Sequence, residues 1–270
     1  MFVVNFVSGK IQMVESLCHR WKRSGIREGD IVLIHSDITR TIIEYRRQTG
    51  CKIGPSDILD SFLDAVGPTG TLLFPLFNFD FTIGCSFDIR STPSQMGALT
   101  EVVRKRPDAI RTGHPVYSFG ALGKESNAFQ GVNNRSAYSD DSPFGILKQL
   151  AGKIAVLDLP DSQSMTFYHH IEEVERVDFR YFKDFSGQYT DEYGLTTEQT
   201  YSIYVRDLDR KVLSNADPAG EMLWKEGLYK GYKPLIDTGL RTINAQTMFN
   251  FIKKIINDGR AEGLLYEIEK

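Results

Sequence analysis

The stretch IVLIHSDITR (residues 31–40) joins a run of four apolar residues to a polar segment that begins at His35. The run follows the turn-forming pair Gly29-Asp30, and a short apolar run bounded by turn residues predicts a strand buried on both faces. In open α/β sheets, ligands bind beyond the carboxyl ends of the strands. The polar segment after Ile34 is therefore predicted to border a binding site.

Two further apolar runs, TLLFPLF (71–77) and KIAVLDL (153–159), predict two more buried strands, and a strand is also expected over 116–122. Helical spacing of apolar residues and capping residues separate these runs. The expected helices cover residues 11–24, 56–66 with Ser56 as N-cap, 94–106, 142–150 with Pro143 at its first position, 164–176 and 245–258. Because no linker or repeat interrupts this alternation, it predicts a single α/β domain over residues 1–270.

Residues 177–215 differ from the rest of the chain because they are rich in aromatic residues that alternate with polar ones. The stretch YSIYVRDLD (201–209) is the clearest example, and this alternation predicts antiparallel strands. We expect this segment to be a β subdomain or an insertion in the α/β domain.

The overall composition excludes several classes of protein. The chain is 41% hydrophobic and 25% charged, with a formal net charge of -3, which does not suit a nucleic-acid partner. No apolar window is long enough for a membrane-spanning helix, so no membrane partner is expected. Cys18, Cys51 and Cys85 are widely spaced and form no CxxC pair, which predicts reduced thiols and a cytosolic location.

The densest group of ionisable residues is SMTFYHHIEEVE (164–175). On a helix, His169 and Glu172 share a face, and a carboxylate beside an imidazole raises its basicity and fixes its tautomer. This pair is predicted to act as a general base. A solvent-exposed charged face is the competing interpretation. A metal site is disfavoured because the HExxH spacing is absent, so no metal is expected.

Other polar positions could bind a ligand. His35 and Ser36 offer donors at a strand end, and backbone amides in such a turn can hold phosphate. A second polar turn contains His114-Pro115 and Ser118. The chain has neither GxGxxG nor GxxxxGK[ST], so an ordinary dinucleotide or P-loop site is not supported.

Taken together, the motifs resemble those of the aminoglycoside 3-N-acetyltransferase family. The resemblance lies in their order and spacing over about residues 10–180. The motifs are HSD (35–37), GPTGTLLFP (67–75), TPSQMG (92–97), RTGHPVYSF (111–119), DSPFGIL (141–147) and the TxxHxxE pattern of Thr166, His169 and Glu172.

This resemblance implies an α/β/α sandwich, acetyl-CoA as the acyl donor and a small-molecule amine on a sugar-like ring as the acceptor. It makes His169 the catalytic base, with Glu172 orienting it, and assigns no role to His170. The positions that would line the CoA site are His35, Ser36, Ser94, His114 and Ser118. The expected assembly is a homodimer.

The acceptor side departs from the family pattern. The resemblance suggests Asp37, Asp161 and Asp207 as substrate-binding residues, although Asp37 replaces a serine and would repel a diphosphate. The stretch TRTIIEYRR (39–47) is either a solvated basic helix face or a site for an anionic acceptor such as a nucleotide-linked amino sugar. Two competing functions stay open at this point: a hydrolase that uses the His/Glu pair, and a non-catalytic acyl-CoA-binding module.

Overall fold

The strand predicted at residues 31–34 lies at the centre of a mixed sheet. The computed structural model describes residues 17–269, and within them seven strands form this sheet in the order β10-β11-β6-β1-β2-β5-β4. Strand β1 pairs in parallel with both β2 and β6, whereas the outer strands pair antiparallel. The strands are β1 (Ile31–Ser36), β2 (Thr71–Pro75), β4 (Ile110–Arg111), β5 (Phe119–Gly123), β6 (Lys153–Leu157), β10 (Lys230–Gly231) and β11 (Leu240–Asn244).

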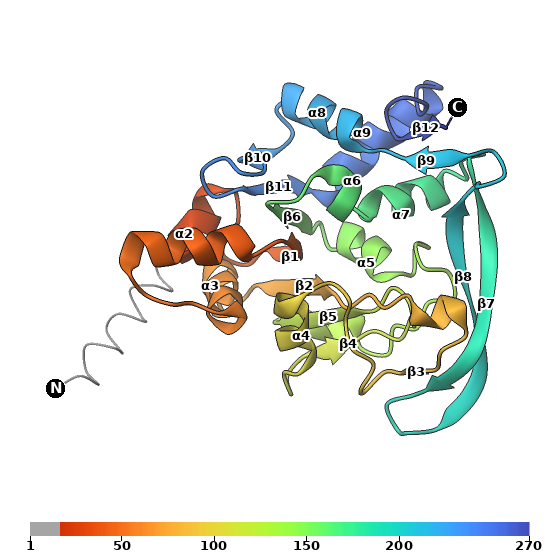
Figure 1. Ribbon diagram of the computed structural model, residues 1–270, viewed down its shortest axis with the longest axis horizontal. Helices are drawn as coiled ribbons and strands as arrows, with labels where there is room; N and C mark the ends of the chain where they lie inside the picture. Colours follow the sequence, from red (N-terminus) through yellow and green to blue (C-terminus); the bar gives the residue numbers. More distant parts are fainter. Residues whose placement is uncertain (1–16, 270) are drawn as a thin grey trace.

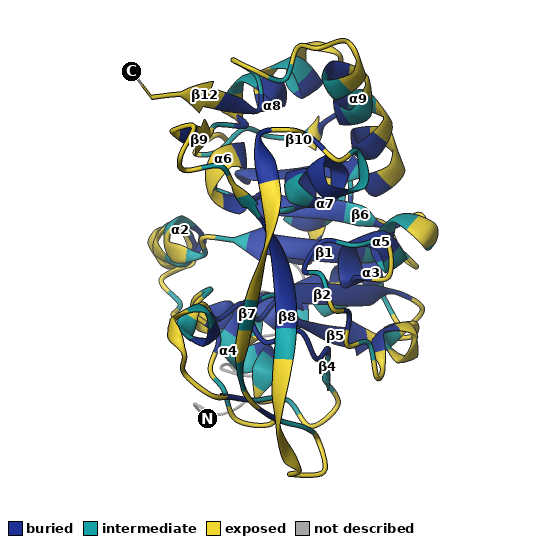
Figure 2. Ribbon diagram, turned by 90° about the vertical axis from the view of Figure 1, so that its right-hand side faces the viewer, coloured by how far each residue is buried: buried dark blue, intermediate teal, exposed yellow. Residues whose placement is uncertain are grey.

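Alternate side chains of β1 enter two separate hydrophobic cores. Leu33 packs into one core, whereas Val32 and Ile34 pack into the other, because successive side chains of a strand point to opposite faces. Helices α5, α7 and α9 cover the first face, and α3, α4 and helical residues 17–23 cover the second (Figure 1). Figure 2 shows the central strands buried between these layers. The predicted α/β/α sandwich is confirmed.

The helices follow the predicted pattern with shifted ends. Helix α3 begins one residue before the expected Ser56 cap: Gly54 is its N-cap, and the Asp57 side chain accepts a hydrogen bond from the Gly54 amide at 3.0 Å. The part of the 11–24 prediction before residue 17 lies outside the described residues. The helices are α2 (Thr39–Thr49), α3 (Pro55–Val66), α4 (Ala98–Arg104), α5 (Pro143–Gln149), α6 (Asp161–Ser164), α7 (Phe167–Val174), α8 (Asp217–Lys225) and α9 (Ala245–Asn257).

Two predicted helices and one predicted strand are wrong in extent. The helix expected over 94–106 starts only at Ala98, because the Ser94 hydroxyl accepts a hydrogen bond from the Met96 amide and holds a turn there. The helix expected over 164–176 is two helices, α6 and α7, separated at Met165 and Thr166. Similarly, the strand expected over 116–122 begins at Phe119.

The aromatic segment forms the predicted antiparallel strands. Strands β7 (Arg180–Thr190) and β8 (Thr196–Arg206) pair along their whole length, and β3 (Phe87–Asp88) joins β7 in parallel. Strand β9 (Val212–Ser214) pairs instead with β12 (Tyr266–Ile268). Buried aromatic residues of the hairpin, including Tyr201 and Tyr204, belong to the same core as α5, α7 and α9. The hairpin therefore packs against the rest of the α/β fold, as Figures 1 and 2 show.

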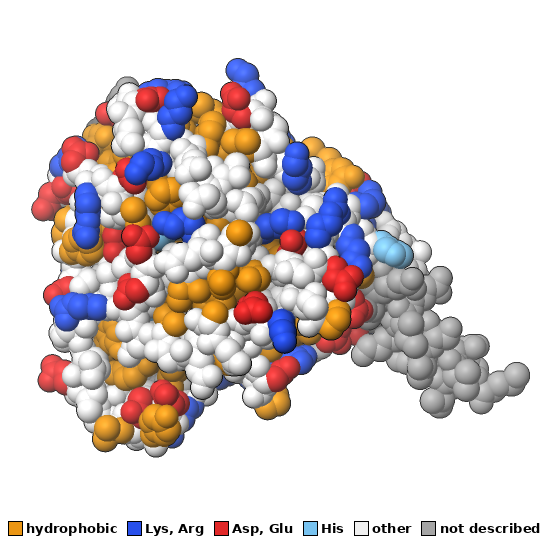
Figure 3. Space-filling model, turned by 180° about the vertical axis from the view of Figure 1, so that it is seen from behind, with side chains coloured by type: hydrophobic (Ala, Val, Ile, Leu, Met, Phe, Trp, Pro, Cys, Tyr) orange, Lys and Arg blue, Asp and Glu red, His pale blue; other side chains and the backbone are white. Residues whose placement is uncertain are grey.

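Positive and negative side chains are interspersed on the molecular face drawn in Figure 3. Within residues 17–269, no helix combines the length and the apolar character that crossing a bilayer requires. The same part of the chain contains no disulfide bond.

Candidate functional site

The predicted pair His169 and Glu172 lies one helical turn apart on α7. The His169 Nδ1 atom lies 2.8 Å from the Glu172 Oε2 atom. The His169 side chain retains a quarter of its accessible surface, whereas Glu172 retains only 2%. The ring of Tyr138 packs edge-on against His169, with 5.3 Å between ring centroids. Helix α7 thus buries the Glu172 carboxylate and leaves the His169 imidazole partly exposed.

Arg180, the first residue of β7, is a third member that the sequence did not reveal. Its Nε atom lies 2.7 Å from the same Glu172 Oε2 atom that contacts His169. The guanidinium also donates to the Tyr204 carbonyl at 3.1 Å and to the Ser214 hydroxyl at 2.9 Å. Glu172 is therefore shared between an imidazole and a buried guanidinium.

The charges of this triad favour a neutral imidazole. Burial lowers the pKa of His169 below its ordinary value, the Arg180 cation lowers it further, and Glu172 opposes both effects. Burial alone would raise the pKa of Glu172, but Arg180 and His169 outweigh it and hold that pKa below the ordinary value. An ionised Glu172 can only accept a hydrogen bond, so Nδ1 of His169 carries the proton and Nε2 presents a lone pair.

His169 borders two cavities. The larger has a volume of about 520 Å³ and is lined partly by the β7–β8 hairpin, including Lys183 and Phe185. The smaller, of about 110 Å³, is bordered by α6 and by Ser214. A cavity of a few hundred Å³ beside a neutral histidine is typical of a small-molecule site. The arrangement can remove a proton from a bound nucleophile.

Comparison with known proteins shows the family of this chain. The family model described as aminoglycoside 3-N-acetyltransferase matches residues 43–257. This chain belongs to the aminoglycoside 3-N-acetyltransferase family. The match continues well beyond residue 180, so the C-terminal third, which carries few of the motifs, is also part of the family domain.

Curated members of the family are distant relatives. Aminoglycoside N(3)-acetyltransferase VII of Streptomyces paromomycinus is 26% identical over 181 residues, which cover 60% of each chain. Aminoglycoside N(3)-acetyltransferase IX of Micromonospora chalcea is 27% identical over 173 residues, covering 57% of this chain and 59% of the relative. The alignments thus span about three-fifths of the length of these relatives.

Several solved structures share the fold along most of the chain. The aminoglycoside acetyltransferase AAC(3)-Xa is 23% identical with a TM-score of 0.74, covering 91% of this chain and 92% of its own. AAC-IIIb, solved as a binary complex with CoASH, is 20% identical with a TM-score of 0.74, covering 91% and 96%. The YokD protein from Bacillus subtilis is 19% identical with a TM-score of 0.73, covering 91% and 99%.

The first two residues that the family resemblance suggested for CoA lie at the carboxyl end of β1. His35 is buried, and burial together with the Arg241 charge lowers its pKa to about 3, so it is neutral. Ser36, the last residue of the strand, is half-buried. Ser36 therefore lies where ligands of open α/β sheets bind, and its contact with CoA stays a prediction.

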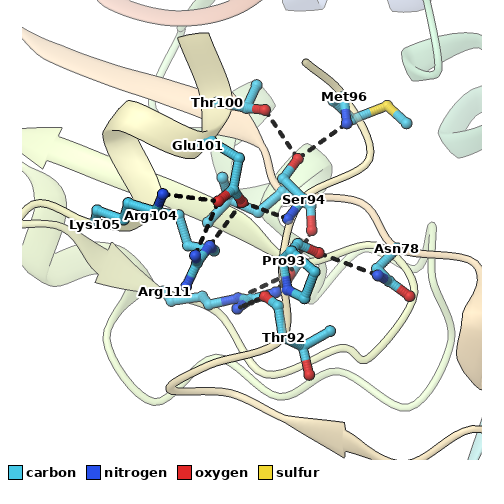
Figure 4. A network of polar contacts seen from close by, with 12 residues as sticks. Asn78, Thr92, Pro93, Ser94, Met96, Thr100, Glu101, Arg104, Lys105 and Arg111 are labelled. Carbon is cyan, nitrogen blue, oxygen red and sulfur yellow. Dashed lines mark hydrogen bonds and ion pairs between the residues drawn. The ribbon is translucent and has the colours of Figure 1, made fainter. Parts of the chain in front are cut away.

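The other three suggested CoA residues are built into the fold. Figure 4 shows Ser94 directed toward Thr100, and their hydroxyl oxygens lie 2.9 Å apart. His114 is fully buried, and its Nδ1 atom accepts hydrogen bonds from the Val116 and Tyr117 amides. Ser118 is also fully buried, donates to the Leu76 carbonyl at 3.1 Å and accepts from Arg111. These side chains shape the loops beside β2, and their contact with CoA stays a prediction.

The three aspartates suggested for the acceptor have other partners here. Asp37 accepts a hydrogen bond from the Thr39 amide at 2.8 Å at the start of α2, so its carboxylate turns toward its own backbone. Asp207 accepts a hydrogen bond from the Arg210 amide at 3.1 Å, in the turn after β8. Neither lines a cavity that His169 borders.

Asp161 borders the smaller cavity, but its carboxylate already has a cationic partner. It forms an ion pair with the buried Arg241 and accepts hydrogen bonds from the hydroxyls of Tyr168, at 2.8 Å, and Tyr229. A buried guanidinium needs such a partner. The structure therefore gives Asp161 a role in stabilising the fold next to the site.

One of the basic residues of helix α2 also has acidic partners. Arg40 forms ion pairs with Asp158 and Glu44, each at 2.8 Å, while Arg46 and Arg47 are exposed at its far end. The part of the chain that the structure describes contains no group of three or more His, Cys, Asp or Glu side chains arranged to hold a metal ion.

Proposed function

We propose that this protein is an acetyl-CoA-dependent N-acetyltransferase that acts on a primary amine of an amino sugar. The observation that carries the proposal is the His169 imidazole, which is held by Glu172 and borders a cavity of about 520 Å³. Membership of a family named for 3-N-acetylation supports the same reaction. The names of the curated relatives suggest an amino-sugar acceptor.

The reaction is a direct transfer in which His169 serves as the base. Nε2 takes a proton from the acceptor amine, and the amine nitrogen attacks the thioester carbonyl of acetyl-CoA. The new C–N bond forms, the C–S bond breaks, and the CoA thiolate leaves and takes up a proton. Glu172 holds the imidazole in the required tautomer and stabilises the imidazolium that forms. The remaining groups of the chain bind and orient the two substrates.

We place the acetyl-CoA substrate against the carboxyl ends of β1 and β2. Ser36 lies at one of these ends, and the loop that contains Ser94 lies beside the other. This edge is where open α/β sheets bind their ligands. A cytosolic location would give the protein access to acetyl-CoA and suits the absence of disulfide bonds among the described residues.

Release of CoA thiol separates this proposal from the two competing functions. We expect thiol release from acetyl-CoA only when a primary amine is present, and mass spectrometry should find the amine heavier by one acetyl group. Thiol release that does not depend on any amine would indicate a hydrolase. Binding of CoA without turnover across an amine panel would indicate a non-catalytic module and would exclude the proposed transfer.

Arg180 should set the pH range of the reaction. Because the pKa of His169 is lowered, the acid limb of the kcat/KM profile should lie below pH 6.5, the ordinary value for histidine. Arg180→Gln removes a nearby positive charge, so the pKa of His169 should rise and the acid limb should move to higher pH. The measurement is kcat/KM against pH at saturating acetyl-CoA.

Arg210→Gln is the matched control for this prediction. Arg210 is an ion-paired arginine in the turn after β8, and its partner is Asp178 rather than Glu172. Its loss should leave the acid limb in place. An unchanged limb in Arg180→Gln, with the protein folded, would show that Arg180 does not tune the base.

A further inference from the structure

The larger cavity beside His169 is lined by cations and by no carboxylate. Its lining includes Arg180, Lys183 and Arg206, whereas none of its lining residues is Asp or Glu. Glu172 neutralises Arg180 from behind the cavity wall. The cavity therefore carries a positive potential that comes mainly from the hairpin residues Lys183 and Arg206.

These two hairpin cations lack acidic partners. Within residues 17–269, no carboxylate lies within 4.0 Å of the Lys183 ammonium or the Arg206 guanidinium. Asp184 follows Lys183 in β7 but projects from the opposite face of the strand, where it contacts Ser202 and pairs with Arg135. Both cations are therefore available to a ligand.

The same wall offers surfaces for a sugar ring. Tyr181, Lys183 and Phe185 alternate along β7 and all line the cavity, opposite Val205 and Ile203 of β8. The Lys183 ammonium lies 5.4 Å from the centroid of the Phe185 ring, which keeps the charge at the cavity surface. Tyr138 packs against His169, Tyr117 packs against Tyr138, and both line the cavity.

We propose that the amine acceptor is anionic: an amino sugar that carries a phosphate, either as a sugar phosphate or as a nucleotide-linked sugar. This inference rests on the proposed acetyl transfer and adds the charge of the acceptor. Lys183 lies on the face of the hairpin that carries Tyr181 and Phe185, and it binds the phosphate. Arg206 adds positive charge from its position opposite Arg180, and the amine lies at His169 Nε2. A polycationic aminoglycoside would instead meet uncompensated like charges across the cavity, which disfavours its binding.

The first test compares amines that differ in charge, with the full-length protein and acetyl-CoA. Glucosamine 6-phosphate is the anionic probe, glucosamine is the matched probe without phosphate, and sisomicin is the polycationic probe. We expect kcat/KM for glucosamine 6-phosphate to exceed that for glucosamine by about tenfold or more, because the phosphate adds a charge-assisted contact with Lys183 and a favourable interaction with the charge of Arg206. A uridine 5′-diphospho-linked amino sugar, tested as a further acceptor, distinguishes the two phosphate sources. A higher kcat/KM than for glucosamine 6-phosphate would indicate a nucleotide-linked sugar, and a lower one would indicate a sugar phosphate. Equal or greater kcat/KM with sisomicin would overturn the inference.

The second test removes the two cations. The double variant Lys183→Gln/Arg206→Gln should raise KM for glucosamine 6-phosphate by about tenfold and leave KM for glucosamine within about twofold. The matched control is Lys225→Gln/Lys254→Gln, which removes two exposed charges on α8 and α9 and should change neither KM. If the first double variant raises KM for acetyl-CoA instead, the cations bind the phosphates of the donor and the inference is wrong.

Binding measured without turnover keeps the two proposals separate. Titration calorimetry of the protein with glucosamine 6-phosphate should show binding that the Lys183→Gln/Arg206→Gln variant weakens by about tenfold. Such binding without any thiol release would retain the anionic site and reject the acetyl transfer. Conversely, thiol release with glucosamine at a rate that neither phosphate nor the double variant changes would retain the transfer and reject the anionic site.

Discussion

Replacing His169 with alanine should lower kcat for acetyl transfer by about two orders of magnitude or more, which is the usual loss when a general base is removed. His169 is the titratable group that borders both cavities. Its Nδ1 atom contacts Glu172, which leaves its Nε2 atom free to accept a proton. The acceptor amine would still bind but would have no positioned base to take its proton. Steady-state thiol release at saturating acetyl-CoA measures the effect.

The control for this variant is His19→Ala, which removes an exposed histidine from the helical segment on the opposite face of the sheet and should leave kcat unchanged. Thermal melting should show that His169→Ala is folded, because the side chain is a quarter exposed. A folded His169→Ala protein with kcat within threefold of the unaltered protein would rule out the proposed mechanism.

Replacing Asp161 with alanine should lower the free energy of unfolding by about 3–5 kcal/mol, because it leaves the guanidinium of Arg241 buried without its carboxylate. Arg241 is 1% exposed, and Asp161 is the acid with which it forms an ion pair. The hydroxyls of Tyr168 and Tyr229 would lose their acceptor as well. Urea denaturation followed by intrinsic fluorescence gives the difference directly.

Asp207→Ala is the matched substitution for Asp161→Ala. Asp207 caps an exposed turn through the Arg210 amide, so its loss should cost less than about 1 kcal/mol. The comparison also separates two roles for Asp161. A variant that keeps its stability but shows a raised KM for the amine would return Asp161 to the substrate-binding role that the sequence suggested.

The central strands could be predicted because each is a short, continuous apolar run. Residues 31–34, 71–77 and 153–159 all contain strands of the central sheet, and their burial on both faces explains why they lack alternation. Strand β11 was missed because Arg241 and Thr242 interrupt the apolar pattern of LRTIN after its first residue. The partner that makes this buried charge tolerable, Asp161, lies 80 residues earlier in the chain.

The contact between His169 and Glu172 could be predicted because residues three apart share a helix face, whereas the contact of Glu172 with Arg180 could not. Arg180 reaches Glu172 only through the path of the chain from α7 into β7, which no local pattern encodes. A sequence motif also does not show whether a polar residue in it contacts a ligand or forms a hydrogen bond within the protein. Ser118 is an example, since its place in the motif does not reveal that its hydroxyl donates to the Leu76 carbonyl.

In the proposed site, helix α7 carries the base and the β7–β8 hairpin forms much of the cavity wall. His169 and Glu172 belong to a helix packed in the core, whereas much of the cavity wall comes from the hairpin, where side chains such as Tyr181 are exposed. Acceptor preference can therefore drift during evolution, or be redesigned, through alternate positions of the two strands without disturbing the chemistry. Arg180 limits that freedom, because its charge lowers the pKa of His169, the proposed base, and its guanidinium pairs with Glu172.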